Sequence, residues 1–243
     1  MDGNRIENRK SAMVKTNTVK TKPKRGWSID EVHQQIKNMI YNNELAPGQK
    51  LIYQDLAKRL STSTTPILQA LNRLENMNLV RYEPNKGFFV GEITEEEARE
   101  LYQAREALEI YIMPKIAGNL TAKKLNEIRQ AFKKHKNSTT PVYRRTLILK
   151  DAEFHLKIAE SAKHEVIYNL LKTIFERIYL KYRPEYLGDD RISDVLKEHR
   201  SLLNALEDKD VEKAIRITKE HIRSGMEHVA ASLHRPKTSF FGR

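Results

Sequence analysis

The sequence predicts a mainly α protein with an N-terminal winged helix-turn-helix and a C-terminal antiparallel α-helical bundle. Glycine is scarce, at 9 of 243 residues, and Glu, Lys, Leu and Ile dominate the composition, which favours helices. The first part of the chain has three helical segments followed by two short β-like runs. From residue 94 onward the segments have helical periodicity and are joined by short links.

The bulk composition limits the class of protein. A hydrophobic content of 39% with 31% charged residues indicates a globular chain. The sequence has no run of about 18 apolar residues and no apolar signal peptide, so we expect no membrane segment. The absence of cysteine excludes disulfides and thiolate chemistry, and it favours a cytoplasmic location.

Residues 1–26 are predicted to form a flexible basic arm. They carry eight basic and two acidic side chains, which gives +6 of the total net charge of +12. Such an arm suits a polyanion such as nucleic acid. A solvated extension without a partner is the alternative, and the composition leaves both open.

Residues 27–92 are predicted to form the winged helix-turn-helix domain. Ser28 and Glu31 make a capping box at the start of its first helix, whose apolar residues recur every three to four positions. Pro47 and Gly48 break the chain after that helix. The segment YQDLAKRL then predicts a short second helix.

A hydroxyl-rich turn, STSTT, precedes the third helix and its Pro66. Proline is tolerated in the first turn of a helix because its missing N–H would have no partner there. Thr65 is therefore predicted to be the N-cap of a helix over 66–76. The runs LVRYE and GFFVGEI, joined by PNKG, predict the β-hairpin of a wing.

Residues 94–234 are predicted to form the helical bundle, followed by a tail over 235–243. The sequence TEEE begins a long helix with a capping box, and Pro114 should kink or end this helix. Thr121 marks the start of the next helix. Four further helices are expected roughly over 142–161, 164–183, 190–206 and 210–233.

One carboxylate and three histidines on three of the predicted helices form a candidate metal site. Asp151 and His155 are four residues apart and share one helix face, while His199 and His221 lie beside apolar residues. Together they offer oxygen and nitrogen ligands suited to Zn²⁺, Ni²⁺ or Mn²⁺. Each histidine taken alone is more simply explained as a semi-buried packing residue. The other histidines show no comparable pairing: His33, His135, His164, His228 and His234.

Four stretches of the chain carry a family resemblance. IYNNELAPGQKLIYQDLAKRL and TTPILQALNRLENMNLV combine a Pro-Gly turn, a Leu-Ala pair, a Thr-Pro turn, and Arg-Leu and Leu-Val pairs. NKGFFV has the pattern of a wing, and LYQAREALE that of the first helix of an effector domain. From about Ile29 to Leu233, the chain resembles the GntR family of bacterial transcription regulators, in the FadR-like branch with an all-helical, FCD-type effector domain.

The resemblance implies a homodimer in which each subunit places the Pro66 helix in the major groove of a double-stranded DNA operator. It implies that residues 94–234 bind the effector and form the dimer contacts. Many such domains place an Asp and three His around a metal at the four positions named above, so one divalent metal per subunit is implied. A small carboxylate effector is implied near Arg105. Pairing with Glu109 in the same helix is an equally good explanation of Arg105.

The DNA-contacting positions depart from the family pattern. Family members commonly carry arginines where this chain has Gln54, Thr64 and Leu68, and each good arginine–guanine pair contributes ~1–3 kcal/mol of discrimination. We therefore expect an operator richer in A·T, or weaker recognition, and the helix-turn-helix could also be retained only as structure. The hydroxyl groups could contact phosphates at a helix N-terminus. The candidate DNA-binding residues are Gln54, Ser63, Thr64, Thr65, Gln69, Arg73, Lys86 and Gly87.

Two functions from different classes follow from these features. The first is a transcription regulator, a repressor, whose DNA affinity responds to a carboxylate bound at or near the metal. The alternative is a helical metalloenzyme that uses the same Asp and His residues, with a degraded DNA-binding domain. The sequence has no phosphate-binding glycine loop and no nucleophile motif, which argues against the enzyme.

Overall fold

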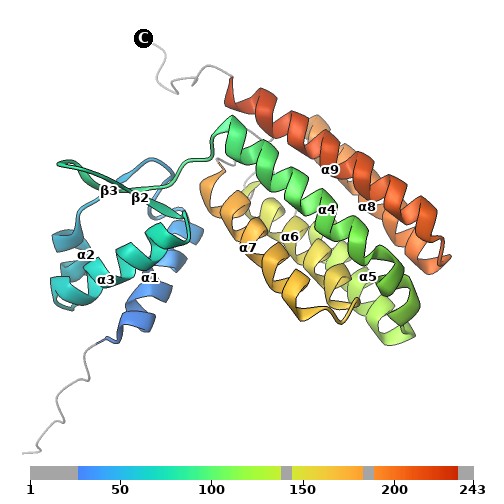
Figure 1. Ribbon diagram of the computed structural model, residues 1–243, viewed down its shortest axis with the longest axis horizontal. Coiled ribbons are helices and arrows are strands. Elements are labelled where there is room, and N and C mark those ends of the chain that lie inside the picture. Colours follow the sequence, from blue (N-terminus) through green and yellow to red (C-terminus); the bar gives the residue numbers. More distant parts are fainter. Residues whose placement is uncertain (1–26, 138–143, 183–188, 235–243) are drawn as a thin grey trace, which may run out of the picture.

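The computed structural model describes residues 27–137, 144–182 and 189–234, and it has the predicted mainly α fold. The basic arm over 1–26 and the tail over 235–243 lie outside the described residues. A small helical unit with a sheet stands beside a larger helical bundle, and one connection after the last strand joins them (Figure 1). In the part of the chain that is described, no helix is long and apolar enough to cross a membrane.

The smaller unit has the element order of a winged helix-turn-helix. Both sheet pairings are antiparallel, in the order β1-β3-β2. The sequence predicts the β2–β3 hairpin but misses β1, because a two-residue strand has no detectable periodicity. The elements are α1 (Ile29–Tyr41), β1 (Lys50–Leu51), α2 (Tyr53–Arg59), α3 (Thr64–Asn76), β2 (Val80–Glu83) and β3 (Gly87–Val90).

Local signals fix the start of this unit's first helix and the turn of the wing. The backbone N–H of Glu31 donates to Ser28 Oγ over 3.2 Å, and the N–H of Ser28 donates to Glu31 Oε2 over 2.7 Å, so the capping box is confirmed. In the hairpin, Asn85 and Gly87 have φ values of 63° and 93°. Asn and Gly adopt this left-handed region most readily, which is why this sequence turns there.

The predicted N-cap of α3 is wrong by two residues. Ser63, rather than Thr65, is the N-cap, and Pro66 is the third residue of the helix. None of the first N–H groups of a helix has an intrahelical partner, so proline is tolerated anywhere in the first turn and does not fix the start. The Ser63 side chain makes no capping hydrogen bond. Its hydroxyl therefore satisfies none of the first backbone N–H groups of α3.

The larger unit is an antiparallel bundle in which α4 lies along α9 (Figure 1). Thr94 caps α4 by accepting from the N–H of Glu97 over 3.2 Å. Pro114 does not end this helix, because Met113 and Ile116 on either side are buried in the bundle core and their packing outweighs the lost hydrogen bond. The helices are α4 (Glu95–Asn119), α5 (Ala122–Asn137), α6 (Arg144–Glu160), α7 (Glu165–Lys181), α8 (Asp189–Glu207) and α9 (Val211–Leu233).

Helix α7 of the larger unit packs against α1 of the smaller unit. Lys37 Nζ on α1 lies 2.7 Å from Glu176 Oε2 on α7. The Tyr41 and Tyr179 rings are 4.7 Å apart between centroids, and Tyr179 belongs to the same apolar cluster as the core of the smaller unit. A movement of α7 would therefore act on the first helix of the helix-turn-helix.

Candidate metal centre

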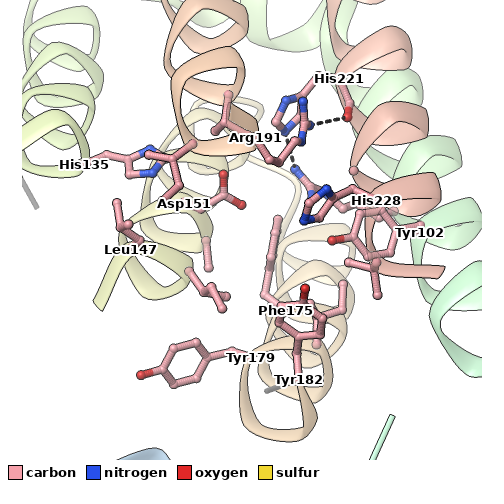
Figure 2. Close-up of a pocket in the computed structure, with 18 residues that line it drawn as sticks. Tyr102, His135, Leu147, Asp151, Phe175, Tyr179, Tyr182, Arg191, His221 and His228 are labelled. Atoms are coloured by element: carbon pink, nitrogen blue, oxygen red, sulfur yellow. Dashed lines mark hydrogen bonds between the residues drawn. The ribbon is translucent and has the colours of Figure 1, made fainter. Parts of the chain in front are cut away.

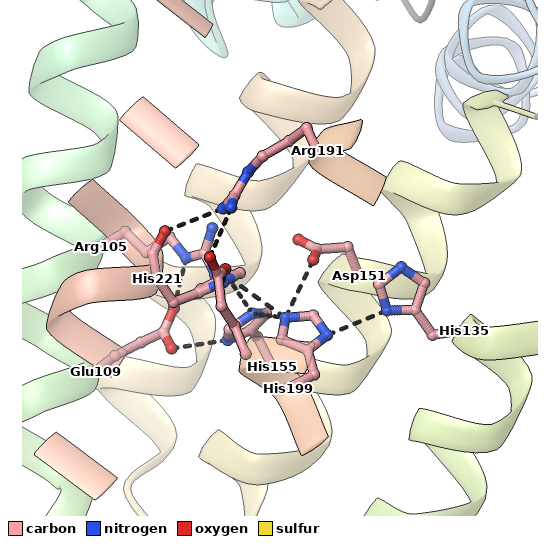
Figure 3. Close-up of polar contacts among 9 residues, drawn as sticks. Arg105, Glu109, His135, Asp151, His155, Arg191, His199 and His221 are labelled. Atoms are coloured by element: carbon pink, nitrogen blue, oxygen red, sulfur yellow. Dashed lines mark hydrogen bonds and ion pairs between the residues drawn. The ribbon is translucent and has the colours of Figure 1, made fainter. Parts of the chain in front are cut away.

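Three bundle helices bring the four predicted metal ligands together. Asp151 and His155 project from α6, His199 from α8 and His221 from α9 (Figure 3). One donor atom from each residue lies within 4.8 Å of the others. The three histidines are buried and Asp151 is half-buried, so the cluster opens to its surroundings on the carboxylate side. We call these four residues the Asp/His cluster.

The spacing of the donor atoms matches a metal coordination sphere. His155 Nε2 lies 3.1 Å from both His199 Nε2 and His221 Nε2, and the last two are 3.4 Å apart. Asp151 Oδ1 is 3.4 Å from His199 Nε2. Donors about 2.1 Å from a zinc ion lie about 3.0 Å apart in octahedral and about 3.4 Å apart in tetrahedral coordination. The spacing of these four donor pairs therefore suits one divalent ion.

Glutamates orient two of the three imidazoles through their outer nitrogens. His155 Nδ1 lies 2.9 Å from Glu109 Oε2, and His221 Nδ1 lies 2.6 Å from Glu198 Oε2. A carboxylate only accepts, so each Nδ1 carries the hydrogen and donates it. In the neutral form of each ring, Nε2 then presents a lone pair to the centre of the cluster, as a metal ligand requires.

A fourth histidine, His135 of α5, contacts the outer nitrogen of the third imidazole, that of His199. Its Nδ1 is 3.2 Å from His199 Nδ1, and both rings are buried. With His199 Nδ1–H as the donor, the lone pair of His199 Nε2 also points inward. The expectation that His135 lacks a comparable pairing is wrong. It follows Ile128 and Phe132 on the buried face of α5, and that spacing could have placed it in the core.

The protonation of the cluster also favours a cation. Burial lowers the pKa of His199 well below its usual value, and neighbouring positive charges lower it further. Burial lowers the pKa of His221 to about 4, although the hydrogen bond to Glu198 acts in the opposite direction. Burial alone would raise the pKa of Glu198, but hydrogen bonds from His221 and Arg191 lower it to about 2. Neutral imidazoles whose lone pairs converge repel one another unless a cation lies between them.

Arg105 pairs with Glu109, as one of its two explanations expects, and it also lies beside the Asp/His cluster. Its Nε donates to Glu109 Oε1 over 2.6 Å, and its Nη2 lies 3.4 Å from His221 Nε2. Burial opposes the charge of Arg105, but Glu109 and Asp151 outweigh it and raise the pKa of the guanidinium. Burial likewise opposes the charge of Glu109, but His155 and Arg105 hold the pKa of this carboxyl well below its usual range. A fixed cation therefore stands beside the cluster.

A pocket of about 80 Å³ adjoins the Asp/His cluster (Figure 2). Asp151, His221, Arg105 and His135 line its polar end, and aromatic rings such as that of Phe175 line the remainder. The sequence does not single out Arg191, which also lines the pocket. Its Nη1 donates to Glu198 Oε1 over 2.7 Å, and its Nη2 donates to the carbonyl oxygen of His221 over 3.3 Å. Arg191 therefore holds the glutamate that orients His221.

The predicted DNA-binding residues lie on α2, α3 and the wing. Most are exposed, and Thr64 and Gly87 are partly buried. Arg73 pairs with Asp30 of α1, and Lys86 Nζ lies 3.0 Å from Glu83 Oε2 within the wing. Their charges are partly engaged with acidic neighbours of the same unit. The others stand on α2 or on α3 and its N-terminus: Gln54, Ser63, Thr64, Thr65 and Gln69.

Comparisons with known proteins agree with this architecture. Residues 28–90 match the model of bacterial regulatory proteins of the gntR family, and residues 100–224 match the FCD domain. The chain is 24% identical over 208 residues to the HTH-type transcriptional regulator YdhC of Bacillus subtilis, covering 85% of this chain and 93% of YdhC. It is 26% identical over 184 residues to the HTH-type transcriptional regulator McbR of Escherichia coli, covering 75% of this chain and 83% of McbR.

Solved structures have the same fold. The E. coli McbR structure superposes with a TM-score of 0.70 at 22% identity, covering 85% of this chain and 98% of McbR. A GntR regulator from Rhodococcus sp. RHA1 superposes with a TM-score of 0.74 at 20% identity, covering 84% of this chain and 97% of the other. The family and these relatives are transcription regulators and not enzymes, which rules against the metalloenzyme alternative. The chain belongs to the GntR family of bacterial regulatory proteins, carries an FCD domain, and is a DNA-binding transcription regulator.

Proposed function

We propose that this protein is a homodimeric repressor whose affinity for operator DNA responds to a small carboxylate bound beside a divalent metal. Asp151, His155, His199 and His221 would hold the metal, which supplies a Lewis-acidic position for a carboxylate oxygen when bound. The observation that carries the proposal is the convergence of three inward-facing Nε2 atoms, 3.1–3.4 Å apart, beside buried Arg105. Zn²⁺, Ni²⁺ and Mn²⁺ all suit this donor set.

The chain's own residues would bind and orient the carboxylate. Arg105 lines the pocket and is held in place by Glu109, so its guanidinium pays little further ordering entropy on binding. Its charge attracts an anion in a buried site, where Coulomb interactions are stronger than in water. The Phe175 ring, whose centroid lies 4.7 Å from the Arg105 guanidinium, covers one side of this contact.

Helix α7 offers a physical route from the pocket to the DNA-binding unit. Phe175 and Tyr179 line the proposed ligand pocket and also line a groove formed by α1, α6 and α7. On the α1 side, Lys37 pairs with Glu176, and the Tyr179 hydroxyl donates to the carbonyl oxygen of Tyr41 over 3.4 Å. A ligand that displaces Phe175 or Tyr179 would shift α1, and it would change DNA affinity only if it bound one arrangement better than the other.

The DNA contacts would come from the N-terminus of α3, from α2 and from the wing. The exposed Ser63 and the first N–H groups of α3 suit a phosphate, because a helix N-terminus carries partial positive charge. Gln54 and Gln69 can contact base edges, and the methyl group of Thr64 can contact thymine. The missing arginines support an operator richer in A·T than is usual for the family.

Metal content and DNA binding of the purified protein test the proposal. Elemental analysis should find about one divalent ion per subunit in the wild type, and His199→Ala should lose it. His234→Ala is the matched control, because His234 is exposed and pairs with Glu95 outside the Asp/His cluster. Binding to DNA from the region upstream of the protein's own gene should weaken when small carboxylates are added to the metal-loaded wild type. A wild type that takes up no zinc, nickel or manganese would overturn the metal site.

A further inference from the structure

The outer side of α4 is exposed along the whole helix, although α4 has neighbours on both flanks. Helix α9 packs along one flank and α7 along the other, so α4 lies in the middle of this face of the bundle (Figure 1). The exposed residues of α4 recur every three to four positions and therefore form one stripe along the helix, which we call the α4 stripe. Its members include Glu96, Glu100, Ala104, Ala107, Tyr111 and Lys115.

Large apolar side chains are exposed on this stripe and beside it. The Tyr111 ring lies 6.4 Å from the ring of His164, which is the N-cap of α7. Leu170 is seven residues before Arg177, whose Nη2 donates to Glu97 of α4 over 2.6 Å, so Leu170 lies on the side of α7 that faces α4. A contiguous exposed apolar patch marks an interaction surface. In the described part of the larger unit, the large exposed apolar side chains are Tyr111, Val166 and Leu170, which are 64%, 66% and 49% exposed.

The α4 stripe is acidic at its start and basic near its end. Glu96 and Glu100 lie in its first turns, and Lys115 lies in its last part. None of these three pairs with another described residue, whereas Glu106 on the flank toward α9 binds Arg223 through two contacts of 2.9 Å. A stripe with opposite charges at its two ends is complementary to a second copy of itself when the two copies run antiparallel.

One register of two antiparallel α4 helices matches both the charges and the side-chain sizes. When the two-fold axis passes between positions 107 and 108, Glu100 of each copy stands opposite Lys115 of the partner subunit, because both positions are equally far from the axis. The same register places Ala104 opposite Tyr111 of the partner subunit. The small side chains of Ala104 and Ala107 let the two helix axes approach to about 8 Å and leave room for the tyrosine ring.

We propose that a second copy of this chain docks on this face, with the two α4 helices antiparallel and crossing at Ala107. Val166 and Leu170 flank the crossing on one side, and the groove between α4 and α9 borders it on the other. The inference rests on the homodimer of the proposed function and specifies its contact surface and orientation.

This orientation also sets the separation of the two DNA-binding units. The wing is joined to the start of α4, and at 1.5 Å per residue the two copies of Glu95 lie about 38 Å apart across the axis. Half-sites one turn of DNA apart are separated by about 34–36 Å. The two units are therefore attached at a distance that suits adjacent half-sites of one operator.

Charge reversal at the two ends of the stripe tests the docking face on the full-length protein. Glu100→Lys and Lys115→Glu each place like charges opposite one another twice per dimer, so each should raise the dissociation constant of the dimer about tenfold to 30-fold. The double variant restores both pairs and should return to within about threefold of the wild type. Lys133→Glu is the control, because Lys133 is an exposed lysine of α5 outside the α4 stripe. Sedimentation velocity over a dilution series measures the dissociation constants.

Mixing the two single variants tests the antiparallel register directly. In a mixed dimer, the introduced lysine of one subunit faces the introduced glutamate of the other, and the native Lys115 faces the native Glu100. The mixture should therefore dimerise at concentrations where each variant alone is monomeric. Ala107→Arg places a large charged side chain at the crossing and should weaken the dimer at least about 100-fold. Circular dichroism should show wild-type helix content in every variant, because the substituted side chains are exposed.

The outcomes separate this inference from the proposed function. Dissociation constants that stay at the wild-type value in Glu100→Lys, Lys115→Glu and Ala107→Arg would overturn the docking face and leave a homodimer that uses another surface. Weakening by both reversals without rescue in the double variant or in the mixture would overturn the antiparallel register. A wild type that is monomeric across the dilution series would overturn both this inference and the proposed homodimer. Metal content should match the wild type in every variant, so a failure of the metal site is observed separately.

Discussion

Replacing Glu109 with Gln tests whether the buried carboxylate organises the proposed metal centre. Its Oε1 accepts from Arg105 Nε over 2.6 Å and its Oε2 accepts from His155 Nδ1 over 2.9 Å. In Glu109→Gln, one of these acceptors becomes an NH₂ donor that faces another donor. Either Arg105 loses a hydrogen bond together with its counter-charge, or His155 changes tautomer and protonates the nitrogen that faces the centre of the Asp/His cluster.

The structure allows two effects of this substitution to be estimated, the loss of stability and the loss of metal affinity. Arg105 and Glu109 have side chains that are 3% and 7% exposed, so the pair is buried. Removing one partner of a buried ion pair costs about 3–5 kcal/mol, which for a chain of this size lowers the Tm by about 6–20 °C. Loss of a residue that orients a metal-bound histidine lowers metal affinity about tenfold to 100-fold. The loss of unfolding free energy should therefore be measurable in the metal-free protein. The loss of metal affinity should appear in a metal-binding assay.

The assay compares Glu109→Gln with Glu106→Gln, one turn earlier in the same helix. Glu106 binds Arg223 through two contacts of 2.9 Å, but the Arg223 side chain is 58% exposed, so we expect a loss of at most about 1 kcal/mol. Denaturant unfolding of the metal-free proteins gives the stability difference. Competition with a chromophoric chelator gives the metal affinity. Equal stability losses in the two variants, or an unchanged metal affinity in Glu109→Gln, would refute this account of the site.

Three further predictions concern the surroundings of the pocket and the DNA surface. His135→Phe should lower metal affinity about tenfold in the chelator competition, because His199 Nδ1 loses its acceptor; an unchanged affinity would show that His135 orients nothing. Lys37→Gln breaks the ion pair with Glu176, so it should reduce the carboxylate-induced change in DNA affinity by up to about fivefold while ligand affinity stays constant. Fluorescence anisotropy with labelled operator measures the DNA affinity. An unaltered response to the carboxylate would contradict the route through α7. Thr64→Arg should tighten binding about tenfold on operators with guanine at the contacted base and not on A·T variants, and equal tightening on both would indicate a phosphate contact.

Sequence alone determined the features that depend on neighbours along the chain. The 3.6-residue period predicted the helices, and the Ser28–Glu31 capping box predicted the start of α1, because both interactions form within one or two turns. The four-residue spacing of Asp151 and His155 placed both on one face of α6 for the same reason. Apolar neighbours indicated that His199 and His221 face inward, and the bundle brings all four residues together.

Tertiary structure alone decided which groups meet across the bundle. The contact of His135 with His199 joins α5 to α8, and the contact of Glu109 with His155 joins α4 to α6. Periodicity states which face of a helix is buried but not which helix covers it, so these partners had no signal in the sequence. Packing also overrode a local rule at Pro114, where burial of the flanking turns keeps α4 continuous. The four members of the Asp/His cluster could thus be predicted from the sequence, while the groups that orient them depend on which helices pack against each other.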